Sequence, residues 1–221
     1  MILNYLMSDR FEPFASAPLA HLTIKTCFLV MFATARGVSE VTSLSGLPGD
    51  VSRESDGSIT LQFLPEFLAK NQKTETLYPS ITIPPLSDII SRNKPDMMNY
   101  PVRALNLYRK RTRHIPSRGQ RALFLFLNPM YTKGIWVLSI SRWMKSLFLD
   151  AYMHLGSQES VTSHVLELIR AGVHEIRSWS TSMAAQSFPL QKVLQAASWS
   201  DADVFVSFYL RYVARRRVNG L

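Results

Sequence analysis

Residues 174–212 read HEIRSWSTSMAAQSFPLQKVLQAASWSDADVFVSFYLRY, and this stretch is the most informative part of the sequence. His174 and Arg177 are three residues apart, so on a helix both lie on one face and can point at the same phosphate. An indole that can donate a hydrogen bond follows at Trp199. A phenol follows at Tyr209, within an aromatic and otherwise apolar segment. The order of these four side chains is informative, whereas each of them alone is common.

This ordered set resembles the C-terminal active-site half of the tyrosine recombinases, the phage-integrase-like family. It is most similar to the recombinases of retrotransposons that integrate through a tyrosine nucleophile. The resemblance covers about residues 18–217 and implies the catalytic fold of that family, an α+β domain that is mainly α with a small antiparallel β-sheet. It also implies DNA strand cleavage and rejoining through a 3′-phosphotyrosyl intermediate in integration or recombination, without a metal or a cofactor.

The resemblance implies a role for each residue of the set. Tyr209 would be the nucleophile, and Tyr212 is the alternative one helical turn later. Arg177 would be the second of two phosphate-binding arginines, with His174 beside it. Trp199 would donate to the phosphate or pack against it. A phenol suits reversible cleavage, because with a pKa of about 10 it is both a reasonable nucleophile and a good leaving group.

A small β-hairpin is predicted in the first half of the chain. Residues 58–63 alternate and are rich in β-branched and aromatic side chains, which is typical of a strand, and residues 78–83 are the expected partner. The polar segment between them contains Lys70 and Lys73. In the resembling family a lysine on such a hairpin is the general acid, and Lys70 matches that place, with Lys73 as the alternative.

One position departs from the family pattern. The family's first phosphate-binding arginine directly precedes a hydrophobic-Ser-Glu triplet, but here Gly37 precedes residues 38–40 and Arg36 lies one residue early. On a continuous helix one residue rotates a side chain by about 100°, so Arg36 would point away from Arg177. Either Gly37 replaces the arginine and leaves a catalytically impaired DNA-binding remnant, or the backbone bends at a helix end so that Arg36 reaches the site.

Positive charge is concentrated in the second half of the chain. Residues 1–100 carry 8 Lys and Arg against 10 Asp and Glu, a net charge of −2, whereas residues 101–221 carry 17 against 6, a net charge of +11. This asymmetry indicates a polyanion partner. We expect double-stranded DNA, with self-association on it; a basic helical module for membrane or protein surfaces is the alternative. A basic helix is predicted over 102–113, with candidate DNA contacts at Arg103, Arg109, Lys110, Arg111 and Arg113.

Length and composition fit one globular domain, since 221 residues with 47% hydrophobic side chains can bury a core. We expect residues 1–17 to be a linker or remnant and residues 18–221 to form the catalytic domain. The single cysteine, Cys27, excludes a disulfide within the chain and a cysteine zinc site. No run approaches the roughly 20 apolar residues that span a bilayer. We therefore expect an intracellular, nuclear protein without a membrane partner.

Overall fold

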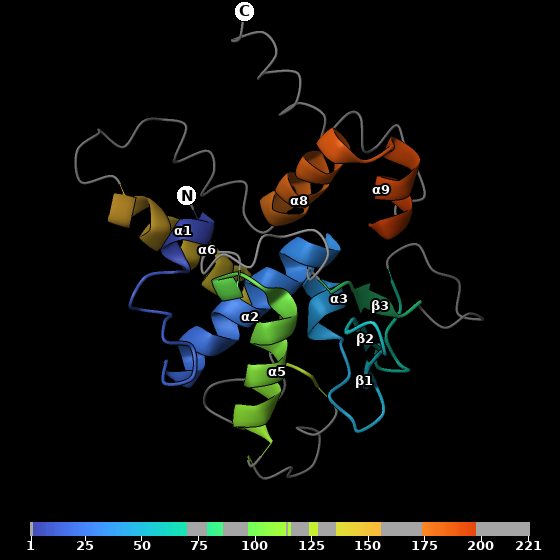
Figure 1. Ribbon diagram of the computed structural model, residues 1–221, viewed down its shortest axis with the longest axis horizontal. Coiled ribbons are helices and arrows are strands. Elements are labelled where there is room, and N and C mark those ends of the chain that lie inside the picture. The colour runs from blue at the N-terminus through green and yellow to red at the C-terminus, as the bar shows by residue number, and fades with distance from the viewer. Residues whose placement is uncertain are drawn as a thin grey trace, which may run out of the picture.

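The computed structural model describes residues 2–69, 79–85, 97–113, 115, 124–127, 136–155 and 174–197. Within these ranges the fold is mixed α+β and mainly helical, with a three-stranded antiparallel sheet (Figure 1). The elements are α1 (Ile2–Tyr5), α2 (Leu19–Thr34), α3 (Val38–Thr42), β1 (Val51–Arg53), β2 (Ile59–Leu61), β3 (Ile81–Ile83), α5 (Pro101–Thr112), α6 (Val137–Leu155), α8 (His174–Ser187) and α9 (Leu190–Ala196).

Helix α2 is the centre of the hydrophobic core. It packs against α5, α6, α8 and β3. A helix that is covered on several sides needs apolar side chains around most of its circumference. In α2 the buried apolar residues are Leu22, Cys27, Phe28, Leu29, Val30 and Met31. The carboxyl end of this helix leads directly into the segment where the candidate site is found.

The small sheet confirms the predicted pair of strands. β2 is the central strand and pairs antiparallel with β3, with Ile59 opposite Ile83, and with β1, with Val51 opposite Leu61. β1 was not predicted from the sequence. The segment between β2 and β3 that was expected to present a lysine includes residues 70–78, which lie outside the described part of the chain.

The predicted helices in the second half are confirmed where the structure describes them. The basic helix expected over 102–113 is α5, and it begins one residue earlier at Pro101, where a proline is well tolerated because no backbone N–H is needed. The helix that begins at His174 is α8, and a turn at residues 188–189 leads into α9. α8 lies against α2, where Ser180 Oγ donates to the Phe32 carbonyl oxygen.

Residues 2–17 are part of the folded body, so the expectation of a linker over 1–17 needs correction. The segment forms α1 and then turns back along α2 and α5. Its apolar side chains enter the core beside α2, and they are Ile2, Tyr5, Leu6, Phe11, Phe14 and Ala17. Burying each of the large ones contributes about 2 kcal/mol, so the segment has a strong reason to stay in place.

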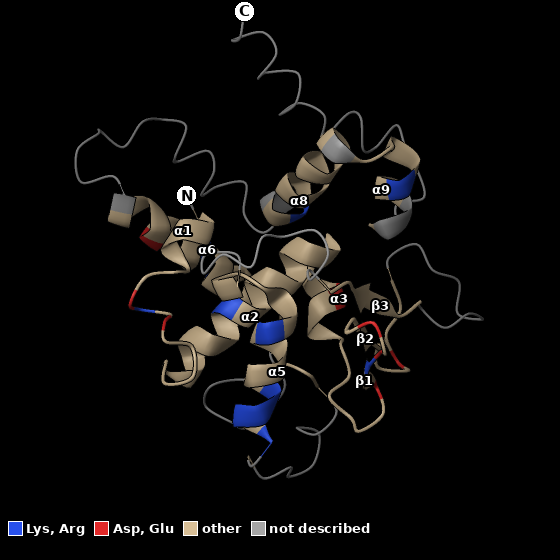
Figure 2. Cartoon of the chain, viewed as in Figure 1, with Lys and Arg blue, Asp and Glu red and all other residues tan. Residues whose placement is uncertain are grey.

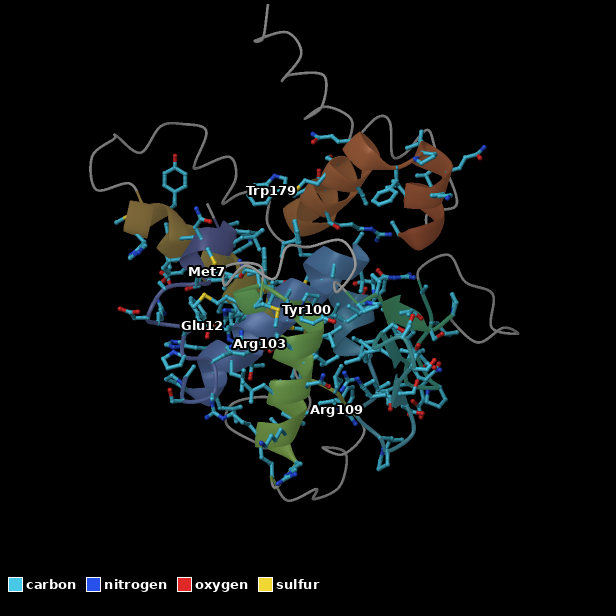
Figure 3. All side chains as sticks on the ribbon, viewed as in Figure 1. Met7, Glu12, Tyr100, Arg103, Arg109 and Trp179 are labelled. Atoms are coloured by element: carbon cyan, nitrogen blue, oxygen red, sulfur yellow. The ribbon has the colours of Figure 1, made fainter. Side chains whose placement is uncertain are left out.

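A buried ion pair ties this segment to the helices. Lys25 Nζ on α2 is fully buried and donates to Glu12 Oε1 at 2.7 Å and to the Leu6 carbonyl oxygen at 2.6 Å. Arg103 on α5 lies 3.3 Å from the same carboxylate, and Figure 3 shows Glu12 and Arg103 close together. Burial raises the pKa of Glu12. Hydrogen bonds from Lys25, Arg103 and the Phe14 N–H, together with the charge of Lys25, outweigh this effect and leave the pKa below its ordinary value.

No helix in the described ranges is both long enough and apolar enough to cross a bilayer.

Candidate functional site

The site begins at the bend between α2 and α3. Ala35 adopts the left-handed backbone conformation with φ of 52°, which ends α2, and α3 starts only at Val38. Arg36 and Gly37 therefore lie between helices. The 100° rotation that would direct Arg36 away from Arg177 applies to a continuous helix, and this chain has none at that point. The bend occurs at Ala35 and not at Gly37, whose φ is −76°.

Glu40 on α3 holds this bend together. Its Oε2 accepts the backbone N–H of Gly37 at 2.8 Å, which caps the first turn of α3. Its Oε1 accepts a hydrogen bond from Arg36 Nη1 at 2.9 Å. The side chains of Arg36 and Glu40 are only 5% and 8% exposed, so this is a buried ion pair. Removing one partner of such a pair typically costs about 3–5 kcal/mol because it leaves a buried charge uncompensated.

Arg177 reaches the same carboxylate from α8. Its Nη1 lies 3.5 Å from Glu40 Oε2, while its Nη2 donates to the carbonyl oxygen of Ala197, just after α9, at 2.7 Å. The Arg177 side chain is 22% exposed, more than either Arg36 or Glu40. Arg177 is therefore the member of the cluster that solvent or a ligand reaches most readily.

Position 37 also faces this cluster. A Cβ atom at Gly37 would lie 3.2 Å from Glu40 Oε2 and 3.8 Å from Arg177 Nη1. A side chain at this position would start beside the Arg177 guanidinium. The structure thus places both Arg36 and position 37 beside the Glu40 carboxylate that Arg177 approaches.

The three charged side chains of this cluster carry two positive charges and one negative charge. The guanidinium groups of Arg36 and Arg177 face one carboxylate, so these three side chains keep a surplus of positive charge. Planar guanidinium forks match the oxygens of phosphate, and their charge is permanent at any physiological pH. The described residues contain no group of three or more His, Cys, Asp or Glu side chains that could hold a metal ion.

The other predicted site residues can be placed only in part. His174 is the first residue of α8, one helical turn before Arg177, but its side chain lies outside the described part of the structure. Lys70 and Trp199 lie outside it altogether, and so does Tyr209. The alternatives Lys73 and Tyr212 also lie outside the described residues.

The five candidate DNA contacts on α5 have different surroundings. Arg103 binds Glu12, and Arg111 Nη1 donates to the Ala17 carbonyl oxygen, so both hold the N-terminal segment. Lys110 and Arg113 are exposed. Arg109 is half-buried, and burial lowers its pKa, although not enough to remove its charge.

The sequence analysis did not identify Glu40 as a site residue or Lys25 as a buried residue that stabilises the fold. Glu40 was noted only as part of the triplet at 38–40, although a Glu four residues after an arginine is a frequent helical ion-pair spacing. The buried Lys25 gave no such signal, because its partner Glu12 lies in a segment that was expected to be a linker.

No model of a known protein family matches this chain, and no curated protein matches its sequence.

Proposed function

We propose that this chain is the catalytic domain of a tyrosine-recombinase-like DNA strand transferase, acting in integration or recombination of a mobile element in the nucleus. Its substrate would be double-stranded DNA, on which copies of the chain associate. The observation that supports the proposal is that Arg36 and Arg177, from distant parts of the sequence, meet at the buried carboxylate of Glu40.

In this proposal the arginines bind the scissile phosphate. Arg177 is the more accessible of the two, and Arg36 supplies a second positive charge from behind the Glu40 carboxylate. Donors placed in advance around the phosphate stabilise the charge that develops on its equatorial oxygens in the transition state. His174, on the same helix as Arg177, acts beside it, and Trp199, two residues beyond the carbonyl that binds Arg177, contributes a further donor.

The reaction is a balanced exchange of two phosphoesters. The Tyr209 phenol releases its proton to solvent and attacks phosphorus, and the bond to the 5′-oxygen breaks. Protonated Lys70 gives that oxygen a proton and then takes one back from solvent, so the protons balance. The products are a 3′-phosphotyrosyl link and a free 5′-hydroxyl. Attack by a 5′-hydroxyl on the phosphotyrosine reverses these steps and rejoins the strand. Because one phosphoester replaces another, the exchange needs no external energy source.

The second candidate function is a catalytically impaired DNA-binding remnant of a mobile-element recombinase. The observation that favours it is the position of Gly37, where a side chain would start 3.8 Å from Arg177 Nη1. If the catalytic arginine belongs there, Arg36 serves only to pair with Glu40. Loss of one phosphate donor of this kind costs about 100-fold or more in rate.

The test is formation of a covalent protein–DNA adduct on a nicked duplex, measured on a denaturing gel. Strand transfer by Tyr209 predicts an adduct with the natural sequence that disappears in Tyr209→Phe and persists in Tyr212→Phe. If the chain is an impaired remnant, it should bind the duplex without forming any adduct.

A further inference from the structure

The basic residues of α5 form two groups that face different surroundings. Arg103 and Arg111 both contact the N-terminal segment. Arg103 forms an ion pair with Glu12, and Arg111 donates a hydrogen bond to the Ala17 carbonyl oxygen. Arg103 also lies over the Phe14 ring, 5.5 Å from its centroid. These two arginines are committed to holding residues 2–17, which are anchored by their buried apolar side chains. Binding a ligand with them would require breaking that packing.

The second group lies on the last turn of the helix and the residue after it. It consists of Arg109, Lys110 and Arg113, and Lys110 and Arg113 are exposed. Figure 2 shows the basic residues gathered at this end of α5. The helix itself contains no acidic residue.

Helix stability alone does not account for this group. A cation in the last turn is favoured by the helix dipole, but the effect is small and confined to that turn. Arg109 and Arg113 are four residues apart, a spacing at which like charges on a helix repel each other. Exposed cations this close together create a positive local field, which attracts a polyanionic partner.

We propose that the exposed pair Lys110 and Arg113 binds neighbouring backbone phosphates of duplex DNA, whereas Arg103 and Arg111 bind none. The inference rests on the proposed function in taking DNA as the partner. A membrane surface fits less well, because an interfacial helix needs an exposed apolar face. The apolar residues of α5 face the core instead, and they are Val102, Ala104, Leu105 and Tyr108.

The experiment compares two double variants of the full chain. The first is Lys110→Ala with Arg113→Ala. The matched control is Arg142→Ala with Lys145→Ala, an exposed arginine and lysine with the same three-residue spacing on α6. Both variants lose two positive charges. The dissociation constant for a duplex is measured over a range of salt concentrations, and the slope of log Kd against log salt reports the number of phosphates contacted.

We expect the slope to fall by about 1.8 in the α5 variant, at about 0.9 for each lost phosphate contact, and to stay unchanged in the α6 control. An equal fall in both variants would mean that only net charge matters and would overturn the proposal, and so would an unchanged slope in the α5 variant. Loss of binding to anionic phospholipid vesicles with DNA binding retained would identify a membrane surface instead.

A paired glutamine variant, Lys110→Gln with Arg113→Gln, keeps long polar side chains and serves if the alanine variant is poorly folded. The outcome is separable from the proposed function. A salt slope that falls in the α5 variant, with no covalent adduct from the natural protein, would support the DNA-binding surface and contradict strand transfer. A covalent adduct from the natural protein, with an unchanged slope in the α5 variant, would support strand transfer and contradict this surface.

Discussion

Arg36 and Arg177 approach opposite oxygens of a single buried carboxylate, that of Glu40. Arg36 Nη1 is 2.9 Å from Oε1 and Arg177 Nη1 is 3.5 Å from Oε2. The left-handed conformation of Ala35 ends α2 before Arg36, so the direction of the Arg36 side chain is not set by the α2 helix. Both the stability of this region and its proposed chemistry therefore depend on Glu40.

Replacing Glu40 should destabilise the fold strongly. Glu40→Ala leaves the buried Arg36 guanidinium without its carboxylate and removes the acceptor for the Gly37 N–H, so we expect a loss of about 3–5 kcal/mol. Glu40→Gln keeps one oxygen acceptor and should lose less. Urea unfolding measures both. If Glu40→Ala unfolds at the same urea concentration as the natural protein, the carboxylate does not hold this bend.

The Glu12 carboxylate should make stability depend on acid pH. Its folded-state pKa lies below the ordinary value, so its contribution is fully present above about pH 5 and is lost as the pH falls through that lowered pKa. The free energy of unfolding should therefore fall more steeply on acidification in the natural protein than in Glu12→Gln, which cannot titrate. If the free energy of unfolding depends on pH in the same way in both proteins, Glu12 is not held ionised by Lys25 and Arg103.

Gly46 should not tolerate a side chain. A Cβ atom there would lie 2.6 Å from the Phe124 carbonyl oxygen, a backbone atom that cannot move aside easily. We expect Gly46→Ala to cost about 2 kcal/mol in the free energy of unfolding through overpacking. Gly49→Ala is the comparison, since a Cβ atom there meets nothing within 4 Å and only its positive φ is strained, at about 1 kcal/mol. Equal losses would contradict the close approach of the two chain segments at Gly46.

Regular elements could be predicted from the sequence where periodicity and length agreed. The helix predicted over 102–113 is α5, the helical spacing of His174 and Arg177 belongs to α8, and the alternating segment at 58–63 contains β2. β1 has only three residues, which is too short for an alternating pattern to be recognised. Its extended conformation is stabilised by antiparallel pairing with β2.

Long-range contacts could not be predicted in the same way. The segment at 2–17 looked like a linker because Pro13 and scattered polar residues interrupt its apolar side chains. Lys25 adds to its anchoring in the core, although lysine usually lies on the surface and is buried here in contact with Glu12. Likewise, the positive φ of Ala35 decides where Arg36 points, and an alanine gives no sequence signal for that conformation.

The Gly37→Arg variant separates the two candidate functions. With φ of −76°, position 37 accepts a side chain without backbone strain. A Cβ atom there would lie 3.2 Å from Glu40 Oε2, so that carboxylate must shift by a few tenths of an ångström. We therefore expect stability within about 1 kcal/mol of the natural protein. If the chain is an impaired remnant, the new guanidinium beside Arg177 should raise adduct formation by about 100-fold or more. If Arg36 already serves as the first arginine, the variant should bring no such gain.

The most direct test is the yield of covalent adduct between the full chain and a nicked DNA duplex, compared for the natural sequence, Arg36→Ala and Tyr209→Phe. Arg36 is buried against Glu40, so Arg36→Lys is included to retain a positive charge if the alanine variant is unstable. Strand transfer with Arg36 and Arg177 as the phosphate-binding pair predicts an adduct with the natural sequence. It predicts none with Tyr209→Phe and a reduction of about 100-fold or more with Arg36→Ala. No adduct from the natural sequence, or one that survives Tyr209→Phe, would contradict it.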